Sequence, residues 1–217
     1  MPEENPNRKR SSLALAAGVI VIALISALGF YLFKNVTSTP TPESPPVTQM
    51  PPVDEPVTYA SSTMKISLTY PKDFTLDESY VNTSVNPNKP ILGVKLTIPL
   101  TMATGTNLSQ DSGISVEQLP RAKICSGDIF LAANVKPQKI TDGTVTYSVA
   151  TSSGAGAGNL YEEAVFALDG SSPCTAVRYF IHSTQIANYP PGTVVAFDRT
   201  ALLAAFDTIR RSLVLSQ

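Results

Sequence analysis

The sequence predicts an α+β fold, an antiparallel β-sheet with a C-terminal helix packed on it, preceded by a single transmembrane helix. Three observations lead to this prediction. The chain has one long apolar run near its N-terminus, several short segments in which apolar and polar residues alternate, and one amphipathic run at its C-terminus.

The apolar run predicts a transmembrane helix over residues 11–33. From Leu13 to Phe33 the only polar residue is Ser26. As a helix this stretch is roughly 31 Å long, which matches the hydrocarbon core of a bilayer. A buried helix of a soluble domain would show a polar stripe, and this run shows none.

The charges beside the span predict its orientation. Arg8, Lys9 and Arg10 precede it, whereas Lys34 alone follows it closely. Basic residues stay on the cytoplasmic side, so residues 1–10 are expected inside and everything after Lys34 outside the cell membrane. A signal peptide cleaved after Ser26-Ala27-Leu28 is the alternative, although its apolar region would normally span about 7–15 residues.

Residues 34–57 are expected to form an extracytoplasmic linker, and residues 58–217 a globular α+β domain. The linker holds seven prolines and no aromatic residue, a composition typical of an extended tether. Of the 16 basic and 17 acidic residues of the chain, the domain keeps 12 of each, because four basic and five acidic residues precede it. This balance gives no basic face and argues against nucleic acid as a partner.

Alternation predicts most of the domain to be strands. In residues 64–70, Met64, Ile66, Leu68 and Tyr70 share one face, and residues 93–100 repeat the pattern. Residues 113–119 give a weaker strand signal. Asp142-Gly143 predicts a tight hairpin turn, and a second hairpin is expected from residues 159–168 and 173–183 on either side of residues 169–172.

Residues 152–159, SSGAGAGN, resemble a phosphate-binding loop in composition only. Such a loop needs a following helix, and the next residues favour a strand instead, so a flexible turn between strands is expected.

Residues 197–215 predict the C-terminal helix. Asp198 is expected to cap its N-terminus, and Leu202, Phe206 and Ile209 belong to an apolar stripe that would pack on the sheet.

Two motifs at the ends of this domain resemble those of PsbP/Mog1-like domains. Residues 64–76, MKISLTYPKDFTL, are similar to the opening strand of these domains, and residues 202–215, LLAAFDTIRRSLVL, to their closing helix. The resemblance implies an α/β/α sandwich in a family whose members bind partners or support assemblies. The middle of the chain resembles small membrane-anchored exported proteins of unassigned function in bacteria.

The reactive side chains of the sequence form no recognisable catalytic site, so we expect that the protein is not an enzyme. No catalytic, cofactor-binding or metal-binding residue is predicted. His182 is the only histidine of the chain. Cys174, Arg178 and His182 suggest a sortase-like site, but on one strand the cysteine and histidine would lie about 26 Å apart. Glu162 and Glu163 would point to opposite faces of a strand, so they make no acid/base pair by themselves.

Cys125 and Cys174, the only cysteines of the chain, are expected to form a disulfide. Both lie in the part placed outside the membrane, where thiols are not kept reduced.

These features favour a membrane-anchored extracytoplasmic binding or assembly module, held in the lipid bilayer by residues 11–33 and acting on an envelope protein partner. The alternative is a solute-binding protein or hydrolase whose carboxylate and hydroxyl site forms no motif. A deep pocket gathering several of Asp169, Asp198, Glu162 and Glu163 would favour this alternative, and a shallow apolar patch would favour the first.

Overall fold

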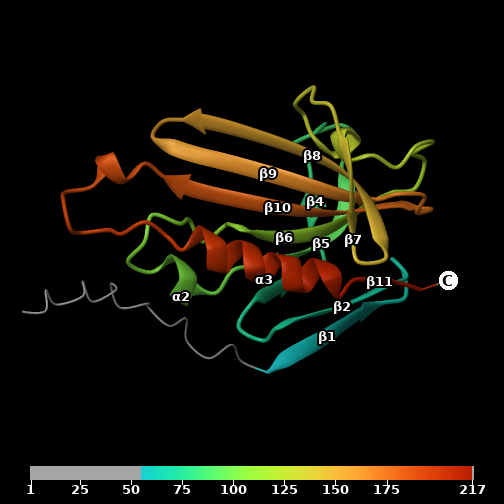
Figure 1. Cartoon of the computed structure of the whole chain (residues 1–217), viewed down its shortest axis with the longest axis horizontal. Coiled ribbons are helices and arrows are strands. Elements are labelled where there is room, and N and C mark those ends of the chain that lie inside the picture. The colour runs from blue at the N-terminus through green and yellow to red at the C-terminus, as the bar shows by residue number, and fades with distance from the viewer. Residues whose placement is uncertain (1–54, 217) are drawn as a thin grey trace, which may run out of the picture. The chain divides into compact units, whose positions relative to one another are not determined.

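The computed structural model describes residues 55–216 and arranges their strands in two sheets (Figure 1). The predictions for residues 1–10, the span 11–33 and nearly all of the linker 34–57 lie outside the described residues. Within residues 55–216, no helix has the length and apolar character needed to cross a bilayer.

The smaller sheet has three antiparallel strands in the order β1-β2-β11. Their bounds are Pro56–Ser61 for β1, Ile66–Pro71 for β2 and Val214–Leu215 for β11. β1 begins two residues before the predicted domain boundary at residue 58. Ile66, Leu68 and Tyr70 of β2 are buried, as the alternation predicted, and the residues between them are less so.

The larger sheet has eight strands, and all of its pairs are antiparallel. Its order is β3-β5-β6-β10-β9-β8-β7, with β4 also paired to β5. The bounds are β3 Thr75–Asp77, β4 Val81–Asn82, β5 Ile91–Thr97, β6 Gly113–Leu119, β7 Gln138–Asp142, β8 Val145–Gly156, β9 Asn159–Leu168 and β10 Cys174–Thr184.

Both predicted hairpins are present in this sheet. β7 and β8 are joined by Gly143 and Thr144, because Asp142 already pairs with Val145. Gly143 adopts a φ of +64°, which glycine reaches without strain. β9 and β10 form the second predicted hairpin, and their connection is residues 169–173, one residue longer than the predicted 169–172.

The C-terminal helix α3, Arg199–Arg211, covers one face of the larger sheet together with β2 of the smaller sheet (Figure 1). The Asp198 side chain accepts a hydrogen bond from the Ala201 N–H at 2.9 Å, so the predicted cap is confirmed. Leu202, Phe206 and Ile209 are buried in the main core. A short helix, α2, Leu100–Ala103, adds Ala103 to this core.

Ser212 joins the two terminal motifs directly. Its hydroxyl accepts a hydrogen bond from the Thr69 N–H at 2.8 Å and donates to the Thr69 carbonyl at 3.0 Å. The serine that ends the helix therefore fixes it to strand β2, and the chain then continues as β11 alongside the same strand.

The opposite face of the larger sheet is covered by a short 3-10 helix, η1, Gly127–Phe130, and by coil. Gly127 packs so closely that a Cβ there would lie 2.8 Å from the Ala150 nitrogen and the Ser148 carbonyl oxygen. Phe130 fills a second core on this side. Among residues 55–216 this face carries no second layer of α-helices, which differs from the α/β/α sandwich that the resemblance implied.

The predicted disulfide between Cys125 and Cys174 is present on this side, with the two Cα atoms 5.0 Å apart. It ties the coil before η1 to the first residue of β10. Residues 152–159 differ from the prediction. Residues 152–156 continue strand β8, and the turn to β9 consists of Ala157 and Gly158 alone.

Candidate functional site

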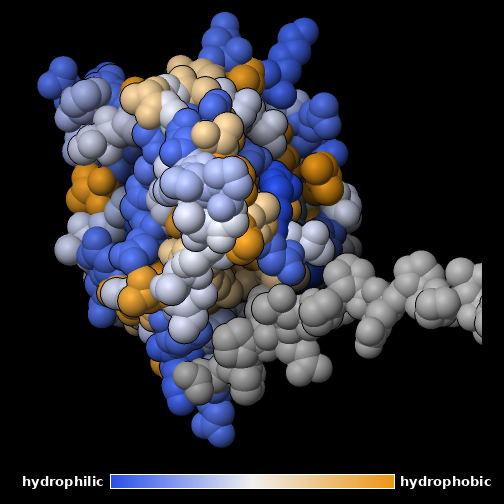
Figure 2. All heavy atoms as spheres, turned by 90° about the vertical axis from the view of Figure 1, so that its left-hand side faces the viewer, coloured by the Kyte–Doolittle hydropathy of each residue, from blue (hydrophilic) through white to orange (hydrophobic). Residues whose placement is uncertain are grey.

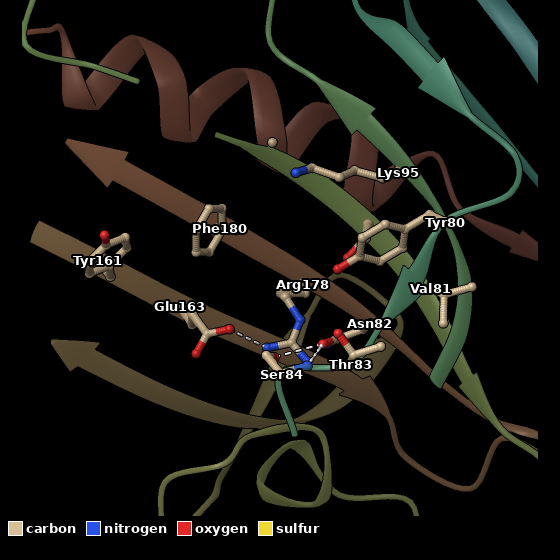
Figure 3. Close-up of a pocket in the computed structure, with 12 residues that line it drawn as sticks. Tyr80, Val81, Asn82, Thr83, Ser84, Lys95, Tyr161, Glu163, Arg178 and Phe180 are labelled. Atoms are coloured by element: carbon tan, nitrogen blue, oxygen red, sulfur yellow. Dashed lines mark hydrogen bonds and ion pairs between the residues drawn. The ribbon is translucent and has the colours of Figure 1, made fainter. Parts of the chain in front are cut away.

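A cleft of about 410 Å³ lies on the face of the larger sheet opposite α3 (Figure 3). Strands β5, β6, β10 and β9 form its floor, and the segment that contains β4 forms a wall. Because side chains alternate along a strand, this face collects the polar residues that the main core excludes. It is lined by Tyr80, Val81, Asn82, Thr83, Ser84, Lys95, Gly113, Ser115, Tyr161, Glu163, Arg178 and Phe180.

Arg178 of β10 is the buried centre of the floor. Its Nε donates to Glu117 Oε1 at 2.8 Å and its Nη2 to Glu117 Oε2 at 3.0 Å, while Nη1 donates to Glu163 Oε1 at 2.6 Å. Nη2 also donates to the Phe130 carbonyl oxygen of η1. Burial alone would lower the pKa of Arg178, but the hydrogen bonds and charge of Glu117 outweigh it and raise that pKa.

Glu117 of β6 is fully enclosed, with 1% of its side chain exposed. Besides Arg178, it accepts hydrogen bonds from the Ser115 hydroxyl at 2.8 Å and from Asn82 Nδ2 at 3.2 Å. Asn82 belongs to β4, so this carboxylate links the wall of the cleft to its floor. Glu163 is 24% exposed and is the carboxylate of this network that reaches the open cleft.

Lys95 of β5 enters the cleft from the other side by crossing over Gly113 of β6. Its Nζ lies 5.6 Å from the centre of the Phe180 ring and 5.9 Å from that of Tyr80. A Cβ at position 113 would lie 3.2 Å from Lys95 Cε and closer still to the Leu96 carbonyl oxygen, so glycine leaves the space that Lys95 occupies.

The ammonium group of Lys95 is hydrogen-bonded to the backbone and is not in direct contact with a carboxylate. Its Nζ donates to the Asp111 carbonyl oxygen at 2.8 Å, and within residues 55–216 it forms no ion pair with a carboxylate. Burial lowers the pKa of Lys95 from its ordinary value, and the charges of Asp111 and Asp77 partly oppose this.

Aromatic rings line the rest of the cleft. The rings of Phe180 and Tyr161 lie 6.4 Å apart at an angle of 28°. His182 stacks on Tyr161 at 4.6 Å, and its Nδ1 lies 2.8 Å from Asp111 Oδ1. Burial and the negative charge of Glu117 raise the pKa of Tyr80 to about 12, so its hydroxyl stays protonated at neutral pH.

The structure does not gather the four acidic residues that the sequence offered for a carboxylate site. Glu162 points to the α3 side, where it pairs with Arg199, and Glu163 pairs with Arg178 on the other face. Asp198 caps α3. Asp169 pairs with Lys139 at 2.6 Å on the surface.

A second hollow, of about 350 Å³, lies at the β8 side of the sheet and has both Glu162 and Glu163 in its lining. Within residues 55–216, no three His, Cys, Asp or Glu side chains lie together in a way that could hold a metal ion.

The sortase-like combination is not assembled. Cys174 and His182 stand at either end of β10, and the sulfur of Cys174 is bonded to Cys125. Arg178, which lies between them, instead forms the ion pairs of the cleft floor.

The loop end at the left of Figure 1 carries scattered apolar residues. In Figure 2, which views this end, orange residues stand among hydrophilic ones and do not merge into one patch on that face. Ile186, Tyr189 and Val195 are among the exposed large side chains of the segment after β10, which includes the short 3-10 helix η2, Ile186–Asn188.

Glu117, Lys95 and Phe180 were not identified as site residues from the sequence. One signal did point to Glu117, and none pointed to Lys95 or Phe180. The segment 113–119 gave a weak strand pattern because Gly113, Ser115 and Glu117 occupy the face that an ordinary core strand would fill with apolar residues.

No family model matches this chain, and no curated protein matches it either. Among solved structures, it is similar to a crystal structure from Bacteroides thetaiotaomicron, with 9% identity and a TM-score of 0.42. That match covers 74% of this chain and 48% of the other, so this chain spans about half the length of that protein.

A second similar structure is the cyanobacterial PsbP (CyanoP) from Synechocystis sp. PCC 6803, with 11% identity and a TM-score of 0.30. It covers 79% of this chain and 99% of the cyanobacterial one.

Proposed function

We propose that the domain is a binding module that holds a small anionic ligand in the cleft between Lys95 and Glu163. The observation that carries this proposal is the half-buried ammonium group of Lys95, which lies beside two aromatic rings and forms no direct ion pair with a carboxylate among residues 55–216. A cation that is partly removed from water loses hydration energy. A negatively charged ligand group that accepts hydrogen bonds from the ammonium group would compensate this loss.

The other lining residues support a ligand with two different ends and a flat middle. Glu163 exposes carboxylate surface and accepts hydrogen bonds, so it favours hydroxyl or amine donors at the end away from Lys95. Phe180 and Tyr161 offer nearly parallel rings between these ends, suited to the flat apolar face of a sugar or an aromatic ring. An acidic sugar combines all three features.

The floor of the cleft favours binding over chemistry. Glu117 and Glu163 both pair with Arg178, so their carboxylate oxygens are held as hydrogen-bond acceptors of the protein's own guanidinium group. Arg178 in turn uses Nε, Nη1 and Nη2 for partners within the protein. The proposed role of this network is to fix the cleft in shape before the ligand arrives.

The binding test uses glucuronate and its uncharged counterpart glucose, titrated into the full chain in detergent micelles and followed by calorimetry. We expect glucuronate to bind at least tenfold more tightly than glucose, and Lys95→Met to remove this difference. Benzoate serves as a second anion, and tighter binding of benzoate than of glucuronate would identify an aromatic ligand instead of a sugar. Equal binding of glucose and glucuronate, or no binding of either anion, would contradict the proposal.

The proposed setting of this module is the outer side of the cell membrane, anchored by residues 11–33 and extended on residues 34–57. The apolar run, the basic residues before it and the prolines after it support this setting. The resemblance of the terminal motifs to PsbP-like domains supports a binding role rather than a catalytic one.

Protease added to spheroplasts should cut between Lys34 and Val57 and release the domain. Protection of the domain until the cells are lysed would contradict the orientation, and a mature N-terminus near Leu28 would show that the span is removed.

A further inference from the structure

Strand β8 is longer than its outer neighbour β7, and this leaves part of the sheet edge open. β7 pairs with residues 145–149 of β8, and the strand then continues to Gly156 paired only with β9. In Figure 1 this part of β8 forms the upper edge of the larger sheet, and no labelled element lies beyond it.

The register shows which backbone groups face outward along this edge. The Asp169 N–H donates to the Thr146 carbonyl at 3.0 Å, so Thr146 lies at a hydrogen-bonded position against the β9 side. Hydrogen bonding alternates from residue to residue in an antiparallel strand. The N–H and C=O groups of Thr151, Ser153 and Ala155 therefore point away from β9, and no backbone hydrogen bond from them to residues 55–216 is present.

This edge has none of the features that normally prevent a further strand from pairing. Residues 150–156 contain no charged residue and no proline, and their pairing with β9 runs without a bulge. Open edges in soluble proteins are usually protected by at least one of these features. The serine, glycine and alanine residues of this edge are also small, so they leave room for the backbone of an added strand.

The hollow of about 350 Å³ lies directly beside the edge. Thr151 and Ser153 belong to its polar lining, and Ala164 and Leu203 are its half-buried apolar residues, whereas Ile181 and Tyr179 are each only 3% exposed. The ion pair between Glu162 and Arg199 stands at its rim, with 40% and 52% of these side chains exposed. Every second side chain of a strand paired with β8 would lie on the same face of the sheet as Thr151 and Ser153, and the one beside these two residues would point into the hollow.

We propose that residues 150–156 of β8 form a docking site for an extended peptide strand of a partner protein, with an apolar side chain in the adjacent hollow. Backbone hydrogen bonds to Thr151, Ser153 and Ala155 give the affinity, and the hollow gives the specificity. This site is separate from the ligand cleft and does not depend on the function proposed for it.

Two other occupants fit these features less well. Residues 34–57 of this chain contain seven prolines, which lack the N–H groups that the edge needs. A second copy paired through its own β8 would present the small side chains of Thr151, Ser153 and Ala155 and leave the hollow unfilled.

The test uses two synthetic peptides that alternate threonine and valine, with leucine or aspartate at the centre and lysines at both ends. Each is titrated into the full chain in detergent micelles. We expect the leucine peptide to bind at least tenfold more tightly than the aspartate peptide. Its binding should slow hydrogen exchange at the N–H groups of Thr151, Ser153 and Ala155, and leave those of Ser152 and Gly154 unchanged.

Ser153→Pro removes one outward N–H, whereas the matched variant Ser153→Ala keeps it. We expect Ser153→Pro to abolish binding and Ser153→Ala to preserve it. Equal affinity for the two peptides, or no binding of either, would overturn the proposal without relying on the proline variant. Protection of the same three N–H groups in the absence of peptide, growing with protein concentration, would also overturn it and identify a second copy as the occupant.

Discussion

Arg178 of β10 donates two hydrogen bonds to the carboxylate of Glu117 of β6, at 2.8 and 3.0 Å. Only 4% of the Arg178 side chain and 1% of the Glu117 side chain are exposed. The two residues lie 61 positions apart in the chain and on neighbouring strands of the sheet. Because both charges are buried, each depends on the other for compensation.

Arg178→Met is expected to destabilise the domain by about 3–5 kcal/mol, because it leaves the Glu117 carboxylate buried with neutral partners only. Urea denaturation followed by circular dichroism measures this loss. Adding Glu117→Gln to the same chain should restore part of the stability by removing the uncompensated charge. The control is Lys139→Met, which breaks an ion pair whose side chains are 71% and 37% exposed, and should cost about 1 kcal/mol or less. A similar cost for Arg178→Met and Lys139→Met would contradict this account.

Gly113→Ala is expected to destabilise the sheet by about 1–3 kcal/mol, because the added Cβ collides with the Leu96 carbonyl oxygen and crowds Lys95. It should also weaken anion binding, since Lys95 reaches the cleft across this position. Gly154→Ala is the matched control, because a Cβ there meets nothing within 4 Å. Thermal melting and the glucuronate titration measure the two effects, and equal melting temperatures for the two variants would refute the packing argument.

Asp142→Asn is expected to destabilise the domain at neutral pH but not in strong acid. Hydrogen bonds from Arg210, at 2.6 Å, and Arg211, at 2.8 Å, lower the pKa of Asp142 below its ordinary value of 3.8. A lowered carboxylate pKa stabilises the fold above the unfolded value, and this contribution disappears as the pH falls through the folded value. The gap in melting temperature between wild type and variant should therefore close below about pH 3.8. A gap that stays constant into strong acid would exclude ionised Asp142 as its cause.

Replacing both Cys125 and Cys174 by alanine is expected to destabilise the domain by about 4 kcal/mol, because the bridge closes a loop of 49 residues in the unfolded chain. Guanidinium denaturation of the oxidised wild type and of the double variant measures the difference. The reduced wild type controls for the loss of the sulfur atoms in the core. Two alkylated cysteines in the unreduced, denatured protein would show that the bridge does not form.

Local sequence patterns predicted the core face of β2 and the start of the C-terminal helix, but not its end, because residues 214–215 of the predicted helix form strand β11. The alternation in residues 64–70 placed Ile66, Leu68 and Tyr70 in the core, and Asp198 marked the start of the C-terminal helix. These signals are readable because the period of a strand or helix is set by neighbouring residues, and a cap acts within one turn. The disulfide was likewise predicted from the sequence, because the chain has only two cysteines and both were expected outside the membrane.

The sequence predicted the hairpins β7/β8 and β9/β10, but the pairing of β6 with β5 and β10, which places the cleft, depends on long-range contacts. Strand β6 pairs with β5 and β10, which brings Glu117, Lys95 and Arg178 together from three distant parts of the chain. Local periodicity carries no information about such long-range pairing. The polar residues on one face of β6 therefore gave only a weak strand signal in the sequence. In the folded domain, Glu117 of that face pairs with Arg178. Lys95 reaches the same cleft by crossing over Gly113.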